Sequence, residues 1–163
     1  MYSIYKKIQS LIIRMFYIIV YTASIIIPVI LAIQVIFRYF LKSPIPGVEE
    51  LASASFIWLV IFGSAILFKE KKHIAVDMFV RNKSENIKKI IDIGNNVFML
   101  LIFAVLIYSC YISIPNQMFY KTVVLKISRS THTIALMISF IFMLMCCIEN
   151  IMRGLLGGHI NAK

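Results

Sequence analysis

Few side chains in this 163-residue sequence are suited to catalysis, ion transfer or metal binding, and those few flank long apolar runs. His132 stands at the start of the last run, whereas a bundle that anchors haem commonly needs a pair of facing histidines. Glu49, Glu50 and Asp92 stand at the rims of two other runs, whereas a proton-coupled exporter needs a carboxylate within the membrane. The sequence contains no zinc, phosphate-loop or nucleophile motif. We therefore expect no catalytic, substrate-binding or metal-binding residue, no bound cofactor, and no independent transport of a charged solute.

The three cysteines add no chemistry of their own. Cys110, Cys146 and Cys147 all lie within apolar runs, and adjacent cysteines do not normally form a disulfide with each other. A free cysteine in apolar surroundings behaves as a small packing residue. We expect that role for all three.

The elements that carry these residues are four long stretches without charge, at residues 15–37, 51–68, 93–120 and 130–148. A helix needs about 20 apolar residues to cross the hydrocarbon core of a bilayer. The strands of a membrane barrel alternate polar and apolar residues, and continuous apolar stretches such as 24–33 do not. We therefore predict an all-α integral membrane protein with four transmembrane helices. They would form a single domain over residues 1–163, with spans at about 12–40, 49–68, 85–114 and 130–150.

Positive charge is unevenly divided between the two sides of such a bundle. Of the 17 Lys and Arg residues, twelve fall in the N-terminal segment, the second connection and the C-terminal tail, against five in the other two connections. The positive-inside rule therefore places both termini and the connection at 69–92 in the cytoplasm. The net charge of +10 gathers beside apolar spans, so we expect membrane lipids as its partners and no nucleic acid.

Two of the predicted helices have features that bear on packing. Helical periodicity resumes at Ser84 and continues to about Ile114, so the third helix is longer than the membrane is thick. We expect it both to tilt and to project a basic amphipathic turn into the cytoplasmic headgroups. Pro115 marks its outer end. The sequence Gly-Ser-Ala at residues 63–65 lies in the middle of the second span, where small side chains allow another helix to approach closely.

The polar residues of the first half form an ordered series. It runs through Gln34, Arg38 and Tyr39 at the end of the first span, Glu49-Glu50-Leu-Ala at the start of the second, Trp58 and Gly63-Ser-Ala within it, and Lys72-His73-Ile-Ala-Val-Asp77 after it. This series resembles the small (DctQ-like) permease subunit of tripartite ATP-independent periplasmic (TRAP) transporters, most densely over residues 31–78. The chain departs from the family pattern at Gly47-Val48, where a Trp or Ser is expected before the acidic pair.

The resemblance implies a multi-pass subunit of a bacterial inner-membrane complex. A large TRAP membrane subunit would hold the substrate and Na⁺ sites and move by an elevator-type mechanism. A periplasmic substrate-binding protein would deliver an organic anion such as a dicarboxylate or sialic acid, and would contact the membrane subunits transiently. The small subunit would form a stable heterodimer with the large one and act as its non-catalytic scaffold in sodium symport. Two alternatives stay open: a membrane anchor for a redox or signalling complex, and a small homodimeric exporter.

The candidates for subunit contacts or structural roles are Arg38, Glu49, Glu50, Trp58, His73 and Asp77. Arg38 and the acidic pair flank one short turn, so we expect an ion pair that fixes this turn beneath the large subunit or the binding protein; separately solvated charges are the alternative. Trp58 lies about 12 Å deeper than Glu50 along a helix, so its indole N–H needs a partner within the bundle or on another subunit. His73 and Asp77 are four residues apart, and we expect a hydrogen bond between them, with a solvated pair as the alternative.

Overall fold

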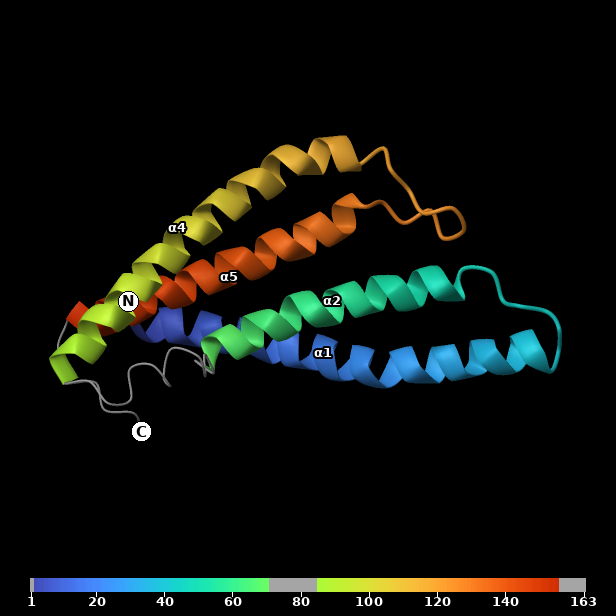
Figure 1. The fold of residues 1–163 in the computed structure, drawn as a ribbon, viewed down its shortest axis with the longest axis horizontal. Helices are drawn as coiled ribbons and strands as arrows, with labels where there is room; N and C mark the ends of the chain where they lie inside the picture. The colour runs from blue at the N-terminus through green and yellow to red at the C-terminus, as the bar shows by residue number, and fades with distance from the viewer. Residues whose placement is uncertain (1, 71–84, 156–163) are drawn as a thin grey trace.

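Four long helices form two antiparallel hairpins in the computed structural model of the chain, which describes residues 2–70 and 85–155. Helix α1 (Tyr2–Tyr39) pairs with α2 (Val48–Lys69), and α4 (Glu85–Gln117) pairs with α5 (Ser130–Leu155). Helices α2 and α5 join the two hairpins, whereas α1 and α4 lie at opposite edges (Figure 1). Each of these helices is long and apolar enough to cross a membrane. The prediction of an all-α membrane protein with four spans is confirmed.

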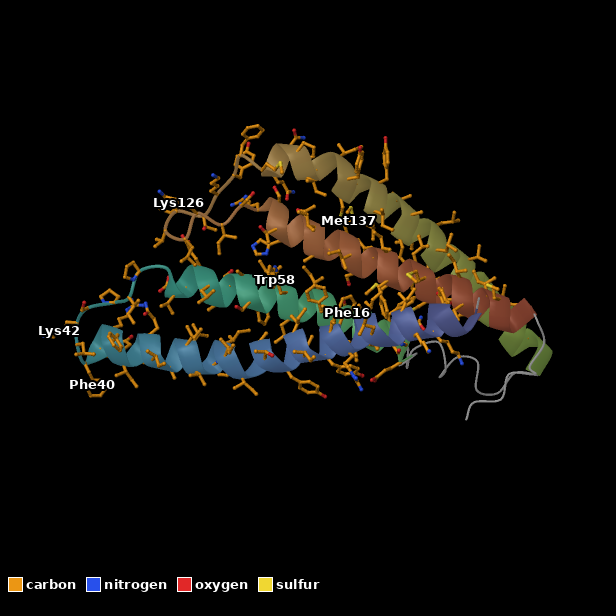
Figure 2. All side chains as sticks on the ribbon, turned by 180° about the vertical axis from the view of Figure 1, so that it is seen from behind. Phe16, Phe40, Lys42, Trp58, Lys126 and Met137 are labelled. Atoms are coloured by element: carbon orange, nitrogen blue, oxygen red, sulfur yellow. The ribbon has the colours of Figure 1, made fainter. Side chains whose placement is uncertain are left out.

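The two hairpins converge at one end and diverge at the other (Figure 1). The diverging end carries the connections at 40–47 and 118–129, whose tips are marked by Lys42 and Lys126 in Figure 2. The charge bias predicts that this end is extracytoplasmic, so we call it the outer end and the opposite one the inner end.

Helix α1 begins earlier than the sequence predicts. The apolar pattern indicates a span from about residue 12, yet the helix starts at Tyr2, and Pro28 lies within it without ending it. The additional residues pack on α5, because the Tyr5 hydroxyl donates a hydrogen bond to the carbonyl oxygen of Met145 at 2.7 Å. Gln9 is also buried on this side of the helix. Contacts between helices therefore extend α1 beyond its apolar run.

Helix α4 ends later than the sequence predicts. Pro115 is expected to mark its outer end, but the helix continues to Gln117. A proline in the last turn removes only the one hydrogen bond that its nitrogen would donate, and the next two residues can keep helical geometry. The expectation of a long helix is confirmed, since 33 residues correspond to about 50 Å.

The apolar core lies in the inner half of the bundle, where α1, α2 and α5 meet. Phe142 of α5 is 1% exposed, and the Phe16 ring of α1 packs against it with centroids 5.1 Å apart. Phe16 also packs against Phe62 of α2 at 4.7 Å. Helix α4 contributes Phe103, whose ring stands edge-on to Phe68 of α2 at 5.2 Å. All four helices thus converge on one aromatic cluster.

Of the small residues in the middle of α2, Ala65 makes a close approach and Gly63 does not. Ala65 is fully buried in the core. A Cβ atom added to Gly63 would meet nothing within 4 Å. Gly63 therefore lies on an open face of α2, beside Val60 and Leu67, which are 50% and 56% exposed. The expectation that residues 63–65 together admit a neighbouring helix is wrong for Gly63 within this chain.

Replacing Phe142 with alanine should lower the free energy of unfolding by about 3–5 kcal/mol, because a cavity would open where three helices meet. Titration with SDS in detergent micelles, followed through the fluorescence of Trp58, the single tryptophan, measures this energy. Phe56→Ala is the matched control, since Phe56 is 57% exposed on α2. Equal losses in the two variants would contradict the position of the core.

Candidate functional site

The first outer connection, at residues 40–47, is held by a buried glutamine. Gln34 of α1 is 8% exposed, and its amide nitrogen donates a hydrogen bond to the carbonyl oxygen of Ile45. Its amide oxygen accepts a hydrogen bond from the N–H of the same residue, and both distances are 3.3 Å. Ile45 lies between Pro44 and Pro46, which have no N–H of their own. A polar residue within an apolar span is the sequence signal that could have predicted this role.

The second outer connection, at residues 118–129, folds back on itself. Lys121 and Ser128 form an antiparallel bridge, and the N–H of Thr122 donates to the carbonyl oxygen of Ile127 at 2.9 Å. The N–H of Ile127 in turn donates to the Thr122 hydroxyl oxygen at 3.0 Å. These bonds hold the tip of the loop, Val124 and its neighbours, as a compact turn.

The two outer connections pack directly on each other at Gly47. This residue has φ +87°, a left-handed conformation that favours glycine. A Cβ atom at this position would lie 3.1 Å from Cγ1 of Val124 and 3.2 Å from Cδ2 of Leu125. The backbone angle therefore favours glycine here, and the close approach of the second connection leaves little room for a side chain.

The carboxylate of Glu50 binds the tip of the second connection. Its Oε1 accepts a hydrogen bond from the N–H of Val124 at 3.0 Å, and its Oε2 accepts one from the N–H of Leu125 at 2.9 Å. Hydrogen bonds to an ionised carboxylate are stronger than those between neutral groups. The contact joins the start of α2 in one hairpin to the connection between α4 and α5 in the other.

The expected ion pair between Arg38 and the acidic pair does not form. The structure describes all three residues, and no ion pair joins the Arg38 guanidinium to Glu49 or Glu50. The guanidinium carbon instead lies 6.0 Å from the centroid of the adjacent Tyr39 ring. The prediction considered only the turn that follows Arg38, whereas the partner of Glu50 comes from a loop 74 residues further along the chain.

Trp58 has its hydrogen-bond partner inside the chain. The indole N–H donates to Nδ1 of His132 at 3.0 Å, across the interface between α2 and α5. Because Nδ1 is the acceptor, the neutral imidazole carries its proton on Nε2. Of the two alternatives for Trp58, a partner within the bundle is therefore the one that the structure shows.

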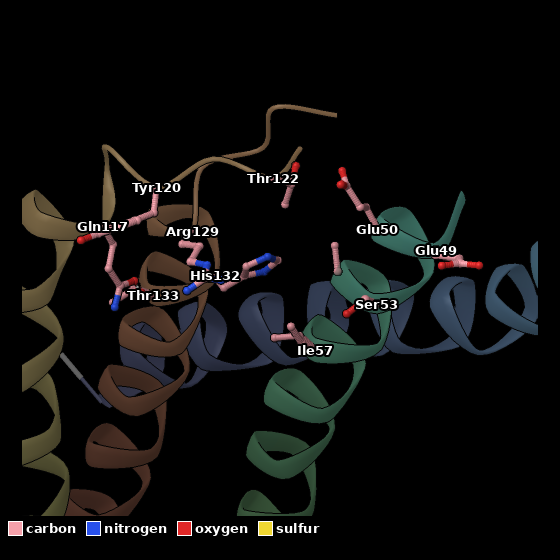
Figure 3. Close-up of a pocket in the computed structure, with 11 residues that line it drawn as sticks. Glu49, Glu50, Ser53, Ile57, Gln117, Tyr120, Thr122, Arg129, His132 and Thr133 are labelled. Atoms are coloured by element: carbon pink, nitrogen blue, oxygen red, sulfur yellow. Dashed lines mark hydrogen bonds between the residues drawn. The ribbon is translucent and has the colours of Figure 1, made fainter. Parts of the chain in front are cut away.

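These contacts surround a cleft of about 720 Å³ between the outer ends of the hairpins. Glu50, Ser53 and Ile57 line it from α2, Arg129 lines it from the end of the second connection, and His132 lines it from the start of α5 (Figure 3). Among the described residues, no group of three or more His, Cys, Asp or Glu side chains could hold a metal ion. The cleft combines hydrogen-bond donors and acidic groups, which can bind a polar ligand.

The inner end holds polar contacts between helices that the sequence pattern does not predict. The amide nitrogen of Asn150 donates to the amide oxygen of Asn96 at 3.2 Å, which ties α5 to α4. Glu149 is 9% exposed, and the Lys69 ammonium lies 5.8 Å from the centroid of the buried Phe142 ring. The sequence places these charges at the rims of spans, but the helices extend far enough to pack around them.

His73 and Asp77 lie outside the described residues. The hydrogen bond expected between them stays a prediction.

Comparisons with known proteins place this arrangement among membrane transport components. The sequence profile described as "Tripartite ATP-independent periplasmic transporters, DctQ component" matches residues 27–157. A protein of Haemophilus influenzae named as a TRAP transporter small permease is 32% identical over 66 residues, so the match spans only 40% of its length and 40% of this chain. The sialic acid TRAP transporter small permease protein SiaQ of Vibrio cholerae is 26% identical over 137 residues, which are 82% of this chain and 79% of that protein.

Glu50→Ala should release the tip of the second outer connection, because the backbone N–H groups of Val124 and Leu125 lose their acceptor. Amide hydrogen exchange at these two residues should become several-fold faster, and trypsin should cleave sooner after Lys126. Glu49→Ala is the matched control, because the Glu49 side chain makes no hydrogen bond with the described residues. Equal exchange rates in the two variants would show that Glu50 does not hold the loop.

His132→Leu should lower the free energy of unfolding by about 1–3 kcal/mol, because it leaves the indole N–H of Trp58 without an acceptor. His132→Asn should retain most of the stability, since its amide oxygen can take the place of Nδ1. The SDS titration followed by Trp58 fluorescence measures both variants. If asparagine costs as much as leucine, the hydrogen bond is not what stabilises this contact.

Proposed function

The chain belongs to the DctQ component family of tripartite ATP-independent periplasmic (TRAP) transporters, and from this we propose that it is the scaffold of the large membrane subunit. It is a multi-pass protein of the bacterial inner membrane. In this proposal the large subunit moves an organic anion through the membrane by an elevator-type motion coupled to Na⁺. A periplasmic binding protein delivers the anion. The relative from Vibrio cholerae is named for sialic acid, so sialic acid and dicarboxylates are the first substrates to test.

The distribution of charge supports a non-catalytic role. Among the side chains that the structure describes, the charged ones lie toward the inner or outer ends of the helices, as Lys69 and Glu149 do at one end and Glu50 and Arg129 at the other. Secondary transporters commonly bind substrate and coupling ions near the middle of the membrane. The proposal therefore assigns the substrate and Na⁺ to the large subunit.

The observation that best supports a scaffold is the exposure of the edge helices. In the apolar stretch of each helix, only 11% of the residues of α1 and 6% of those of α4 are buried within the bundle. The corresponding share is 33% in each of α2 and α5. Helices within a membrane associate through close packing and hydrogen bonds. The broad apolar faces of α1 and α4 give a large membrane subunit ample surface on which to pack.

The outer end supports a contact with the binding protein. Phe40, Phe119 and Val123 are 84%, 87% and 88% exposed there, on connections that Glu50 and Gly47 hold together. Large apolar side chains exposed at a surface often mark a site of protein association. We assign this surface to the binding protein or to a loop of the large subunit.

Co-expression with the large subunit of the same transporter should yield a complex that survives purification through a tag on this chain. In liposomes with the binding protein outside, uptake of labelled sialic acid or dicarboxylate should require both membrane subunits and an inward Na⁺ gradient. Liposomes with this chain alone are the control and should show only background uptake. Accumulation of a solute by this chain alone, or full uptake by the large subunit alone, would refute the proposed role.

A further inference from the structure

The outer cleft presents hydrogen-bond donors that nothing in the described part of the chain accepts from. The guanidinium of Arg129 lines the cleft, and it makes no hydrogen bond or ion pair with the described residues. His132 lies beside it and uses Nδ1 to accept from Trp58, which leaves its Nε2–H free to donate (Figure 3). Arginine binds phosphate and carboxylate groups well because its N–H groups match two oxygens at once. This side of the cleft therefore suits an anionic group.

The opposite side of the cleft selects against a ligand with net negative charge. Glu49 and Glu50 both line it, and only Glu50 is engaged by backbone N–H groups. Two carboxylates and one guanidinium together leave the lining acidic. A ligand that carries both a phosphate and an ammonium group would match both sides, whereas a ligand with an anion alone would meet repulsion.

The position of the cleft indicates the source of such a group. Its lining residues come from the first turns of α2, the last turn of α4, the connection at 118–129 and the first turn of α5. This is the level of the outer headgroups for helices that span a bilayer. A phospholipid is present at that level in every membrane, and its phosphate is held at the depth of these side chains.

An open apolar face continues from the cleft toward the middle of the membrane. Ile57 lines the cleft and is 37% exposed, and Val60 and Leu67 follow on the same side of α2 with 50% and 56% exposed. Gly63 lies between them, and nothing stands within 4 Å of its missing side chain. This face is long enough, at about 15 Å from residue 57 to residue 67, to hold most of an acyl chain.

We propose that the outer cleft binds one zwitterionic phospholipid of the phosphatidylethanolamine type. Its phosphate accepts hydrogen bonds from Arg129 and His132, its ammonium group lies toward the acidic start of α2, and one acyl chain lies along α2 over Gly63. The bound lipid fills the space between the diverging hairpins. This inference is independent of the proposed scaffold function, because it concerns the isolated chain in any membrane.

The test is lipid binding to the full-length chain in detergent, measured by native mass spectrometry and by the melting temperature. Dioleoyl-phosphatidylethanolamine should bind one molecule per chain and raise the melting temperature, and dioleoyl-phosphatidylglycerol should do so more weakly. Arg129→Gln should weaken binding by roughly tenfold. Lys121→Gln is the matched control, because Lys121 lies on the same connection but does not line the cleft. Gly63→Leu should also weaken binding without lowering the melting temperature of the lipid-free protein.

Two further ligands identify which part of the lipid is recognised. Inorganic phosphate and dioleoylglycerol should each leave the melting temperature unchanged at the concentrations at which the phospholipid acts. An equal effect of inorganic phosphate would overturn the proposal, because it would reveal a site for a free anion. Equal binding by the Arg129→Gln and Lys121→Gln variants, or a preference for phosphatidylglycerol, would overturn it as well.

Discussion

The carboxylate of Glu50 accepts hydrogen bonds from two consecutive N–H groups of the opposite hairpin, and the arrangement of the outer end depends on this contact. The core of the bundle lies in its inner half, so packing alone leaves the outer halves of α2 and α5 apart. Glu50 connects them above the cleft, and the hydrogen bond between Trp58 and His132 connects them below it. The cleft lies between these two levels, where the outer halves of α2 and α5 are not packed against each other.

Polar side chains within the membrane spans also determine how the helices are arranged. A polar group within a membrane span needs a partner in the protein, because lipid offers none. Gln34 satisfies it through the backbone of Ile45, and Asn96 satisfies it through Asn150 on the adjacent helix. Each of these bonds also determines how two segments are placed. The few polar side chains of the spans thus specify the geometry that the many apolar ones leave free.

The fold could be predicted from the sequence because the apolar runs are long and the charges cluster between them. The site could be predicted only in part. Glu50 and Trp58 stand out as polar residues that need partners, but the sequence does not show that the partners are Val124 and His132, which are 74 residues away in each case. Contacts between hairpins depend on how two helix pairs are tilted, and no periodicity along one helix carries that information.

Gly47 makes the shapes of the two outer connections depend on each other. The family resemblance leads one to expect Trp or Ser at Gly47-Val48, yet a Cβ atom on Gly47 would already press against the side chains of Val124 and Leu125. A bulkier side chain at this position requires the second connection to move away from the first. A chimera that exchanges one of them between relatives, and leaves the other behind, joins halves that no longer fit.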